Sequence, residues 1–164
     1  MFTTSSNTLS QREKKLIVAL QQVKVRRAEG LFVAEGPKLI GELLATFPCR
    51  LLVTTASFLP LVESLGQIQR IVLLPEGYDF SSLSTLRTPR PMIALLELPT
   101  PPSTSTITAP SLLLDNVQDP GNVGSILRTA DWFGCRTVFT TEGTADPFSP
   151  KVVQATMGAL ARVR

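Results

Sequence analysis

The 164-residue sequence contains no histidine, and this absence removes more chemistry than any other feature of its composition. It excludes Ser-His-Asp triads, Cys-His dyads, imidazole general bases and every His-ligated metal site. Cysteine is scarce too, because Cys49 and Cys135 are the only two and lie far apart without a Cys-x-x-Cys spacing. We therefore expect neither a disulfide framework nor a metal centre, and we expect both thiols to be buried.

Long apolar runs are also missing. No run approaches the roughly 20 residues of a membrane helix, and residues 1–15 lack the apolar centre of a signal peptide, so we expect a cytoplasmic protein without membrane contact. Lys and Arg exceed Asp and Glu by 16 to 13, and residues 1–40 hold seven Lys or Arg against three Glu. This basic bias favours a polyanionic partner, although a solvated helix face is the commoner reason for such a charge run.

The first 98 residues predict a small α/β domain in which helices cover a sheet. An amphipathic helix is predicted over residues 9–28 by apolar residues at helical spacing: Leu16, Ala19, Leu20 and Val23. The stretch LFVAE predicts a short strand, and Pro37 marks the first turn of a second helix. Apolar runs bounded by Pro and polar residues predict further strands at 50–55, 70–75 and 91–99.

Residues 99–110, PTPPSTSTITAP, contain almost nothing that a core could bury. We interpret them as a linker between two domains, 1–98 and 111–164. The alternative is a long surface loop within one domain, but a structureless stretch of about twelve residues is uncommon inside a compact domain.

The second domain begins with a predicted βαβ unit. SLLLD predicts a buried strand, NVQDPGNV a loop, GSILRTADWFG a helix that ends near Gly134, and RTVFTT a second strand. Two strands joined in this way are expected to be parallel, with a right-handed crossover. Ser149 as N-cap and Pro150 at the first helical position then predict a helix from Lys151 to about Leu160.

The loop after SLLLD is a candidate site, because ligands of open parallel sheets gather beyond the carboxyl ends of the strands. Gly121 and Gly124 permit a partner to approach the backbone, and Arg128 lies one helical turn after Gly124. Together with the first N–H groups of the helix, this arrangement suits a phosphate. The simpler alternative is a structural turn in which Arg128 pairs with Asp131 or Asp119.

At this point the residues resemble a known family. The stretch LLLDNVQDPGNVGSILRTADWFG is similar to the first motif of the SpoU/TrmH family of RNA 2′-O-ribose methyltransferases, in the SPOUT superfamily. KVRRAEGLFVAEGPKLIGELL and LRTPRPMIALLELP resemble the family's L30e/L7Ae-like substrate-binding domain, and SPKVVQATMGAL resembles a later segment of its catalytic domain. The resemblance covers nearly all of residues 9–164. It implies an L30e-like RNA-binding domain, the linker, and the first part of an α/β trefoil-knot domain.

The resemblance also implies an activity, namely S-adenosylmethionine-dependent 2′-O methylation of rRNA, or second of tRNA, by a homodimer. The family's Asn-x₅-Arg pattern falls on Asn122 and Arg128, which are the expected catalytic residues. Because a guanidinium has a pKa above about 12, we assign Arg128 to phosphate binding and to stabilisation of the developing 2′-alkoxide. RNA contacts are expected, by charge alone, from Lys14, Lys15, Lys24, Arg26 and Arg27.

The sequence departs from the family pattern at its end, because it stops at Arg164 before the GSEG-like loop and the SLN-containing segment. In the family these complete the knot and most of the S-adenosylmethionine pocket. We therefore expect a truncated enzyme, with no cofactor-binding residue assigned in these 164 residues. The alternative is a non-catalytic RNA-binding protein built on the L30e-like platform, with salt-sensitive RNA affinity and no cofactor. A Rossmann-type nucleotide enzyme ranks last, because neither GxGxxG nor GxxxxGK[ST] is present.

Overall fold

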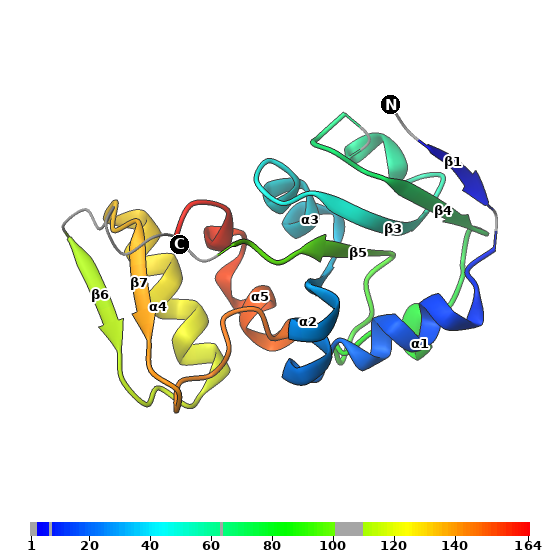
Figure 1. The fold of residues 1–164 in the computed structure, drawn as a ribbon. Helices are drawn as coiled ribbons and strands as arrows, with labels where there is room; N and C mark the ends of the chain where they lie inside the picture. Colours follow the sequence, from blue (N-terminus) through cyan, green and yellow to red (C-terminus); the bar gives the residue numbers. More distant parts are fainter. Residues whose placement is uncertain (1–2, 7, 63, 101–109) are drawn as a thin grey trace. The chain divides into compact units, whose positions relative to one another are not determined.

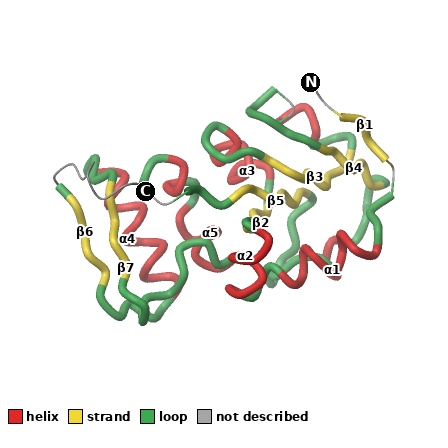
Figure 2. Tube along the Cα trace, viewed as in Figure 1, coloured by secondary structure: helices red, strands yellow, loops and turns green. Residues whose placement is uncertain are grey.

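The computed structural model describes residues 3–6, 8–62, 64–100 and 110–164 (Figure 1). The chain divides into two compact units, Met1–Leu98 and Pro99–Arg164, and each contains its own sheet (Figure 2). Most of the predicted linker, 101–109, lies outside the described residues. In the part of the chain that is described, no helix is long and apolar enough to cross a membrane.

The N-terminal unit is built on a five-stranded mixed sheet with the order β1-β4-β3-β5-β2. β4 pairs in parallel with β1 and β3, whereas β5 runs antiparallel to β2 and β3. The carboxyl ends of β2 and β3 therefore lie at the same edge of the sheet as the start of β5. The strands are β1 Thr3–Ser6, β2 Leu31–Glu35, β3 Cys49–Thr55, β4 Arg70–Leu74 and β5 Met92–Glu97.

Both faces of strands β2 to β5 are buried, as their almost continuous apolar sequences predict. On one face, Ile17 of helix α1 (Gln11–Ala19) shares a core cluster with Leu31 and Val33 of β2. Phe32 points to the opposite face, where its ring packs edge-on against Phe47 with centroids 5.1 Å apart. Phe47 follows helix α3 (Pro37–Leu44), which begins with Pro37 as expected. Four residues of α3 are buried: Leu39, Ile40, Leu43 and Leu44.

The helix predicted over residues 9–28 is two helices, α1 and α2 (Val23–Glu29). The chain turns between them, and Arg26 of α2 reaches back to this turn. Its Nη1 donates hydrogen bonds to the carbonyl oxygens of Leu20 at 2.8 Å and Gln21 at 2.7 Å. These carbonyls lie beyond the last turn of α1, so the guanidinium replaces partners that a continuous helix would supply. Arg26 is only 2% exposed, which corrects the prediction that it is a surface contact for RNA.

The two cysteines are free and buried, as expected. Desolvation raises the pKa of the Cys49 thiol to about 12. Cys49 is therefore a neutral core residue of β3 at physiological pH, and it does not offer a nucleophile.

The C-terminal unit confirms the predicted β-α-β order with parallel strands. Strand β6 (Ser111–Leu114) pairs in parallel with β7 (Thr137–Thr140), and helix α4 (Pro120–Trp132) connects them. Beyond the end of β7, helix α5 (Pro150–Thr156) packs against α4. The backbone of Arg164 also exchanges hydrogen bonds with Arg136 and Val138, alongside β7.

Three expectations for this unit are wrong. Helix α4 begins at Pro120, not at Gly124, so the second half of the predicted loop NVQDPGNV is helical. SLLLD does not form a buried strand, because only Leu114 of β6 is buried whereas Leu113 is 66% exposed. A sheet of two strands shields few side chains, so an apolar run does not ensure burial here. The last helix is also shorter than predicted: α5 ends at Thr156 because Met157 takes a left-handed conformation with φ +52°, and a 3₁₀ turn, Ala159–Ala161, follows.

Candidate functional site

The candidate site is formed by the two loops that leave the carboxyl ends of β6 and β7, residues 115–119 and 141–149. Because β6 and β7 are parallel, both loops lie at one edge of the sheet. The backbone N–H of Asn116 donates to Thr141 Oγ1 at 3.0 Å, and that of Val117 donates to Thr144 Oγ1 at 3.3 Å. The Thr141 hydroxyl donates to Asp115 Oδ1 at 2.9 Å. These bonds fasten the two loops into one unit, which we call the loop platform.

Thr141 and Thr144 were not among the residues that the sequence marked as functional. The only signal was that a hydroxyl residue, Thr141, ends the second predicted strand, RTVFTT. Such a signal is weak, because the hydrogen-bond partners of the two threonines lie about 25 residues away and can be identified only when the two strands are paired.

Asn116 is a structural residue of the loop platform. Its backbone lies in the left-handed region with φ +54°, which asparagine tolerates better than most residues. Its Oδ1 accepts a hydrogen bond from Gln118 Nε2 at 3.2 Å. A Cβ placed at Gly143 would stand 2.4 Å from the same oxygen, so the second loop can approach Asn116 only because residue 143 is glycine.

Asp119 fixes the start of α4. It occupies the N-cap position, and its Oδ1 accepts a hydrogen bond from the backbone N–H of Asn122 at 2.8 Å. Pro120 follows at the first helical position, where its fixed φ suits the helix. The orientation of the first turn of α4 therefore depends on one exposed carboxylate.

Replacing Asp119 with alanine is expected to lower the free energy of unfolding by about 1 kcal/mol, because one helical N–H loses its acceptor. Asp119→Asn should retain most of that stability, since its amide oxygen can accept the same bond. Urea unfolding followed by circular dichroism measures both variants. Equal losses for alanine and asparagine would show that the carboxylate does not act as a cap.

Arg128 is exposed on α4 and makes no hydrogen bond or ion pair with any described residue. The two acids that could have neutralised it are engaged elsewhere. Asp131 binds Arg136 Nη1 at 3.0 Å and Arg162 Nε at 2.8 Å, and Asp119 caps the helix. The alternative in which Arg128 merely pairs with Asp131 or Asp119 is therefore not what the structure shows, and its guanidinium is available to a ligand.

Asn122 is exposed in the first turn of the same helix, where its backbone N–H is used by the cap. Its side-chain amide makes no hydrogen bond to the described residues. Six positions separate it from Arg128, which corresponds to about 120° around an ideal helix and about 9 Å along it. The two side chains can therefore contact different parts of one extended ligand.

The two glycines of the loop have different roles. Gly121 is exposed, and the nearest atom to a Cβ built there is Asp119 Oδ1 at 3.0 Å. Gly124 is buried, and a Cβ built there would lie 2.3 Å from the Cβ of Ala155 in α5. Only Gly121 is open to a ligand, and the prediction that Gly124 also admits a partner is corrected: its partner is α5.

Ser149 occupies the N-cap position of α5, as predicted, but its hydroxyl makes no capping bond. Its Oγ is buried and has no hydrogen-bond partner among the described residues. Buried hydroxyls without partners are uncommon, so this atom can accept or donate a bond to a group not present in the structure. No cluster of His, Cys, Asp and Glu able to hold a metal ion occurs in the described ranges.

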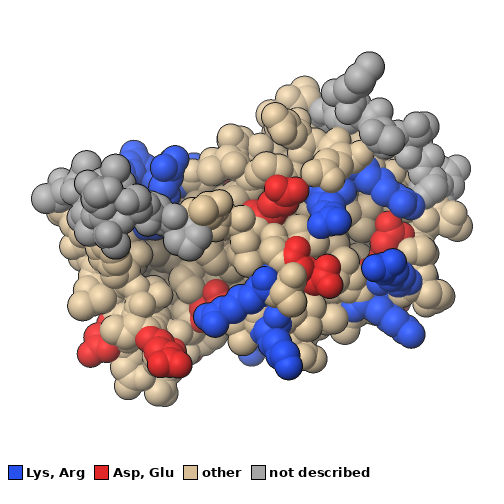
Figure 3. All heavy atoms as spheres, in the orientation of Figure 1, with Lys and Arg blue, Asp and Glu red and all other residues tan. Residues whose placement is uncertain are grey.

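The basic residues expected to contact RNA lie on the first two helices, over which Lys and Arg gather in Figure 3. Lys15 of α1 and both Lys24 and Arg27 of α2 are exposed, whereas Lys14 is half-buried. With Arg26 withdrawn, four of the five predicted residues have access to solvent.

Two family descriptions match the chain, one for each unit. The MRM3-like substrate binding domain matches residues 12–94, which is about half of the chain, and the SpoU rRNA Methylase family matches residues 109–164. These matches define a class of protein in which a substrate-binding unit precedes a SpoU-type methylase unit.

Known proteins of this class are similar over nearly the whole chain. The 23S rRNA (guanosine(2553)-2′-O)-methyltransferase RlmP of Bacillus subtilis is 33% identical, over 85% of this chain and 55% of its own. A solved structure, described as a putative RNA methyltransferase of the TrmH family from Porphyromonas gingivalis, is 51% identical with a TM-score of 0.90. The match covers 96% of this chain and 62% of the other. An AdoMet-bound rRNA methyltransferase from Sinorhizobium meliloti is 28% identical with a TM-score of 0.77, and the match covers 98% of this chain and 62% of the other.

The chain belongs to the SpoU/TrmH family, within the SPOUT superfamily, as the sequence motifs predicted. It spans little more than half of the length of the three proteins just described.

Proposed function

We propose that this chain is part of an enzyme that transfers a methyl group from S-adenosylmethionine to a ribose 2′-hydroxyl of RNA. One observation carries the proposal: Arg128, at the position of the family's arginine, is exposed and without a partner among the described residues. An arginine that served only the fold would be expected to bind one of the acids near it, and both of those acids have other partners.

The reaction requires little acid-base catalysis from the residues of this chain. The ribose 2′-oxygen attacks the methyl carbon, the new C–O bond forms as the S–C bond breaks, and the 2′ proton is lost to water. S-adenosylmethionine supplies the electrophilic methyl group, and S-adenosylhomocysteine is the leaving group. Arg128 stays protonated, so its donors stabilise the negative charge that develops on the 2′-oxygen or hold the adjacent phosphate. No histidine is needed for these roles.

Asn122 and the loop platform complete the part of the site that these residues provide. The Asn122 amide can orient the nucleotide from the first turn of α4, beside N–H groups that favour a phosphate. The buried Ser149 hydroxyl is a polar atom that a bound cofactor could satisfy, which fits a site at the carboxyl ends of β6 and β7. We assign no other residue to S-adenosylmethionine.

The substrate we propose is rRNA rather than tRNA. We also propose that the enzyme is cytoplasmic and acts as a homodimer. The B. subtilis relative is named for 23S rRNA, and the N-terminal unit matches a substrate-binding domain and presents basic helices. Methyl incorporation from labelled S-adenosylmethionine into purified rRNA and tRNA distinguishes the two substrates. Sedimentation equilibrium measures the assembly state.

The decisive experiment is calorimetric titration of S-adenosylmethionine into the 164-residue chain and, in parallel, into the longest natural form of the same sequence. Micromolar binding by either form supports the enzyme. If neither binds the cofactor but both bind RNA, the second candidate, a non-catalytic RNA-binding protein, replaces it. RNA affinity that falls steeply with salt is expected in both cases, so only cofactor binding separates them.

A further inference from the structure

The N-terminal unit buries one carboxylate that its fold does not obviously need. Glu35, the last residue of β2, is only 3% exposed. Its Oε1 accepts hydrogen bonds from the backbone N–H of Thr85 at 2.9 Å and the Thr85 hydroxyl at 3.1 Å, and its Oε2 accepts one from the Ser84 hydroxyl. Burial of a carboxylate is costly unless hydrogen bonds compensate, and these three all come from one loop.

That loop, residues 84–91, is held at both ends. Glu35 fastens its start, and the Ser84 hydroxyl continues the network by accepting a bond from the backbone N–H of Leu86 at 3.0 Å. At its end, the Pro91 carbonyl accepts a bond from the hydroxyl of the buried Thr54 at 3.3 Å. The segment between the two anchors is LRTPR, in which Pro89 further restricts the backbone, as Pro91 does at the second anchor. The loop is irregular, yet its position is strongly determined.

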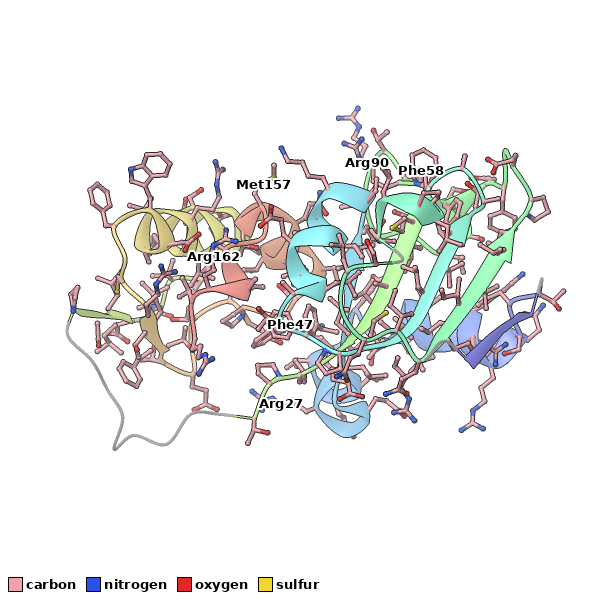
Figure 4. All side chains as sticks on the ribbon, turned by 90° about the horizontal axis from the view of Figure 1, so that it is seen from above. Arg27, Phe47, Phe58, Arg90, Met157 and Arg162 are labelled. Atoms are coloured by element: carbon pink, nitrogen blue, oxygen red, sulfur yellow. The ribbon has the colours of Figure 1, made fainter. Side chains whose placement is uncertain are left out.

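Two exposed arginines lie between these anchors. Arg87 and Arg90 make no hydrogen bond or ion pair with the described residues. The side chain of Arg90 crosses Gly36, because a Cβ built there would lie 3.4 Å from Arg90 Cγ. In Figure 4 Arg90 extends outward from the ribbon.

A third exposed cation, Lys38, stands two residues after Gly36 in the first turn of α3. The loop enters β5 at the edge of the sheet where β2 and β3 end, so it lies beside the start of α3. We call Lys38, Arg87 and Arg90 the edge cations. They lie apart in sequence from the basic residues of α1 and α2.

Resting on the proposed function, we propose that the edge cations bind phosphates of the RNA substrate, and that Glu35 is the positioning residue that holds their loop in place. Three cations on a fixed backbone, none of which has an ion pair among the described residues, suit a polyanion. The backbone that carries them need not be ordered on binding, and the cations displace counterions from the phosphates. A buried carboxylate that bonds only to a loop is explained if the position of that loop matters.

The test measures RNA binding by fluorescence anisotropy over a series of salt concentrations, using a labelled rRNA fragment. Arg87→Ala/Arg90→Ala is expected to weaken binding about tenfold and to reduce the slope of log K against log salt by about 1 to 2, one phosphate contact for each cation. The control is Arg50→Ala, which removes an exposed cation at the beginning of β3, at the opposite edge of the sheet. It should leave affinity and slope nearly unchanged.

The positioning role of Glu35 is tested by a double-mutant cycle with the two arginines. Glu35→Gln is expected to weaken RNA binding in the native background but to add little in the Arg87→Ala/Arg90→Ala background, since the loop then has no cations left to position. Ser84→Ala is a milder variant that removes one of the three bonds if Glu35→Gln fails to fold. Additive losses in both backgrounds would overturn the positioning role of Glu35.

The outcomes separate this inference from the proposed function. If the native chain binds RNA and Arg87→Ala/Arg90→Ala changes neither the RNA affinity nor its salt dependence, the edge cations do not bind phosphates. The proposed function then still stands. If the native chain binds no RNA at any salt concentration, the proposed function fails and this inference fails with it.

Discussion

Arg128→Ala should reduce methyl transfer by at least about 100-fold while RNA affinity changes little, because the guanidinium acts on charge that develops in the transition state. The side chain has no partner in the described structure, so its removal disturbs no internal bond, and the free energy of unfolding should stay within about 0.5 kcal/mol. Single-turnover methylation of rRNA in the longest natural form of the chain, beside anisotropy and urea unfolding, measures the three quantities.

Arg128→Lys tells a charge effect from a geometric one. Lysine keeps the positive charge but has no planar fork of donors, so we expect RNA affinity to stay near the native level, as in Arg128→Ala, and little of the turnover to return. The interpretation fails if Arg128→Ala retains normal single-turnover rates. It also fails if the variant loses RNA binding in proportion to activity, because Arg128 would then only hold the substrate.

Gly124→Ala should destabilise the C-terminal unit by about 1–3 kcal/mol, although the change adds only one methyl group. The new Cβ would meet the Cβ of Ala155 at 2.3 Å and its carbonyl carbon at 2.9 Å. The second contact is with backbone, so α4 and α5 must move apart as whole helices. Thermal unfolding of the variant measures the loss, and Gly124→Val should give a larger one.

The matched control is Ser125→Ala, one position further along α4, where the side chain is exposed. Alanine is favoured in helices, so the control should keep or slightly raise stability. If Gly124→Ala were as stable as the control but unable to bind RNA or S-adenosylmethionine, the glycine would serve ligand approach, as the sequence first indicated.

Local signals in the sequence were sufficient for most of the elements. Proline at a helix start marks α3 and α5, and apolar runs bounded by polar residues mark β2 to β5. The start of α4 at Pro120 was placed four residues too late. The motif around Asn122 and Arg128 led to the family, and the family is confirmed. What remains a prediction is the role of each of those two residues.

Three of these outcomes depend on contacts that the sequence pattern does not show. Helical periodicity continues through residues 20–22, and only the folded chain shows that Arg26 binds the carbonyls of a broken helix. The small size of Gly124 predicts a close approach but does not say to what, since Ala155 lies on another helix. Glu35 was invisible for the same reason, because its partners Ser84 and Thr85 follow some 50 residues later.

The exposure of β6 has a consequence for the behaviour of this chain in concentrated solution. Strands at a sheet edge act as templates for other strands unless Lys, Pro or a bulge interrupts them, and Ser111–Leu114 contains none of these residues. With Leu113 two-thirds exposed and a net charge of only +3, electrostatic repulsion between molecules offers little protection. We therefore expect β6 to contribute to self-association of the 164-residue chain at high concentration, together with the exposed Trp132 and Phe133, and Leu113→Lys should reduce it.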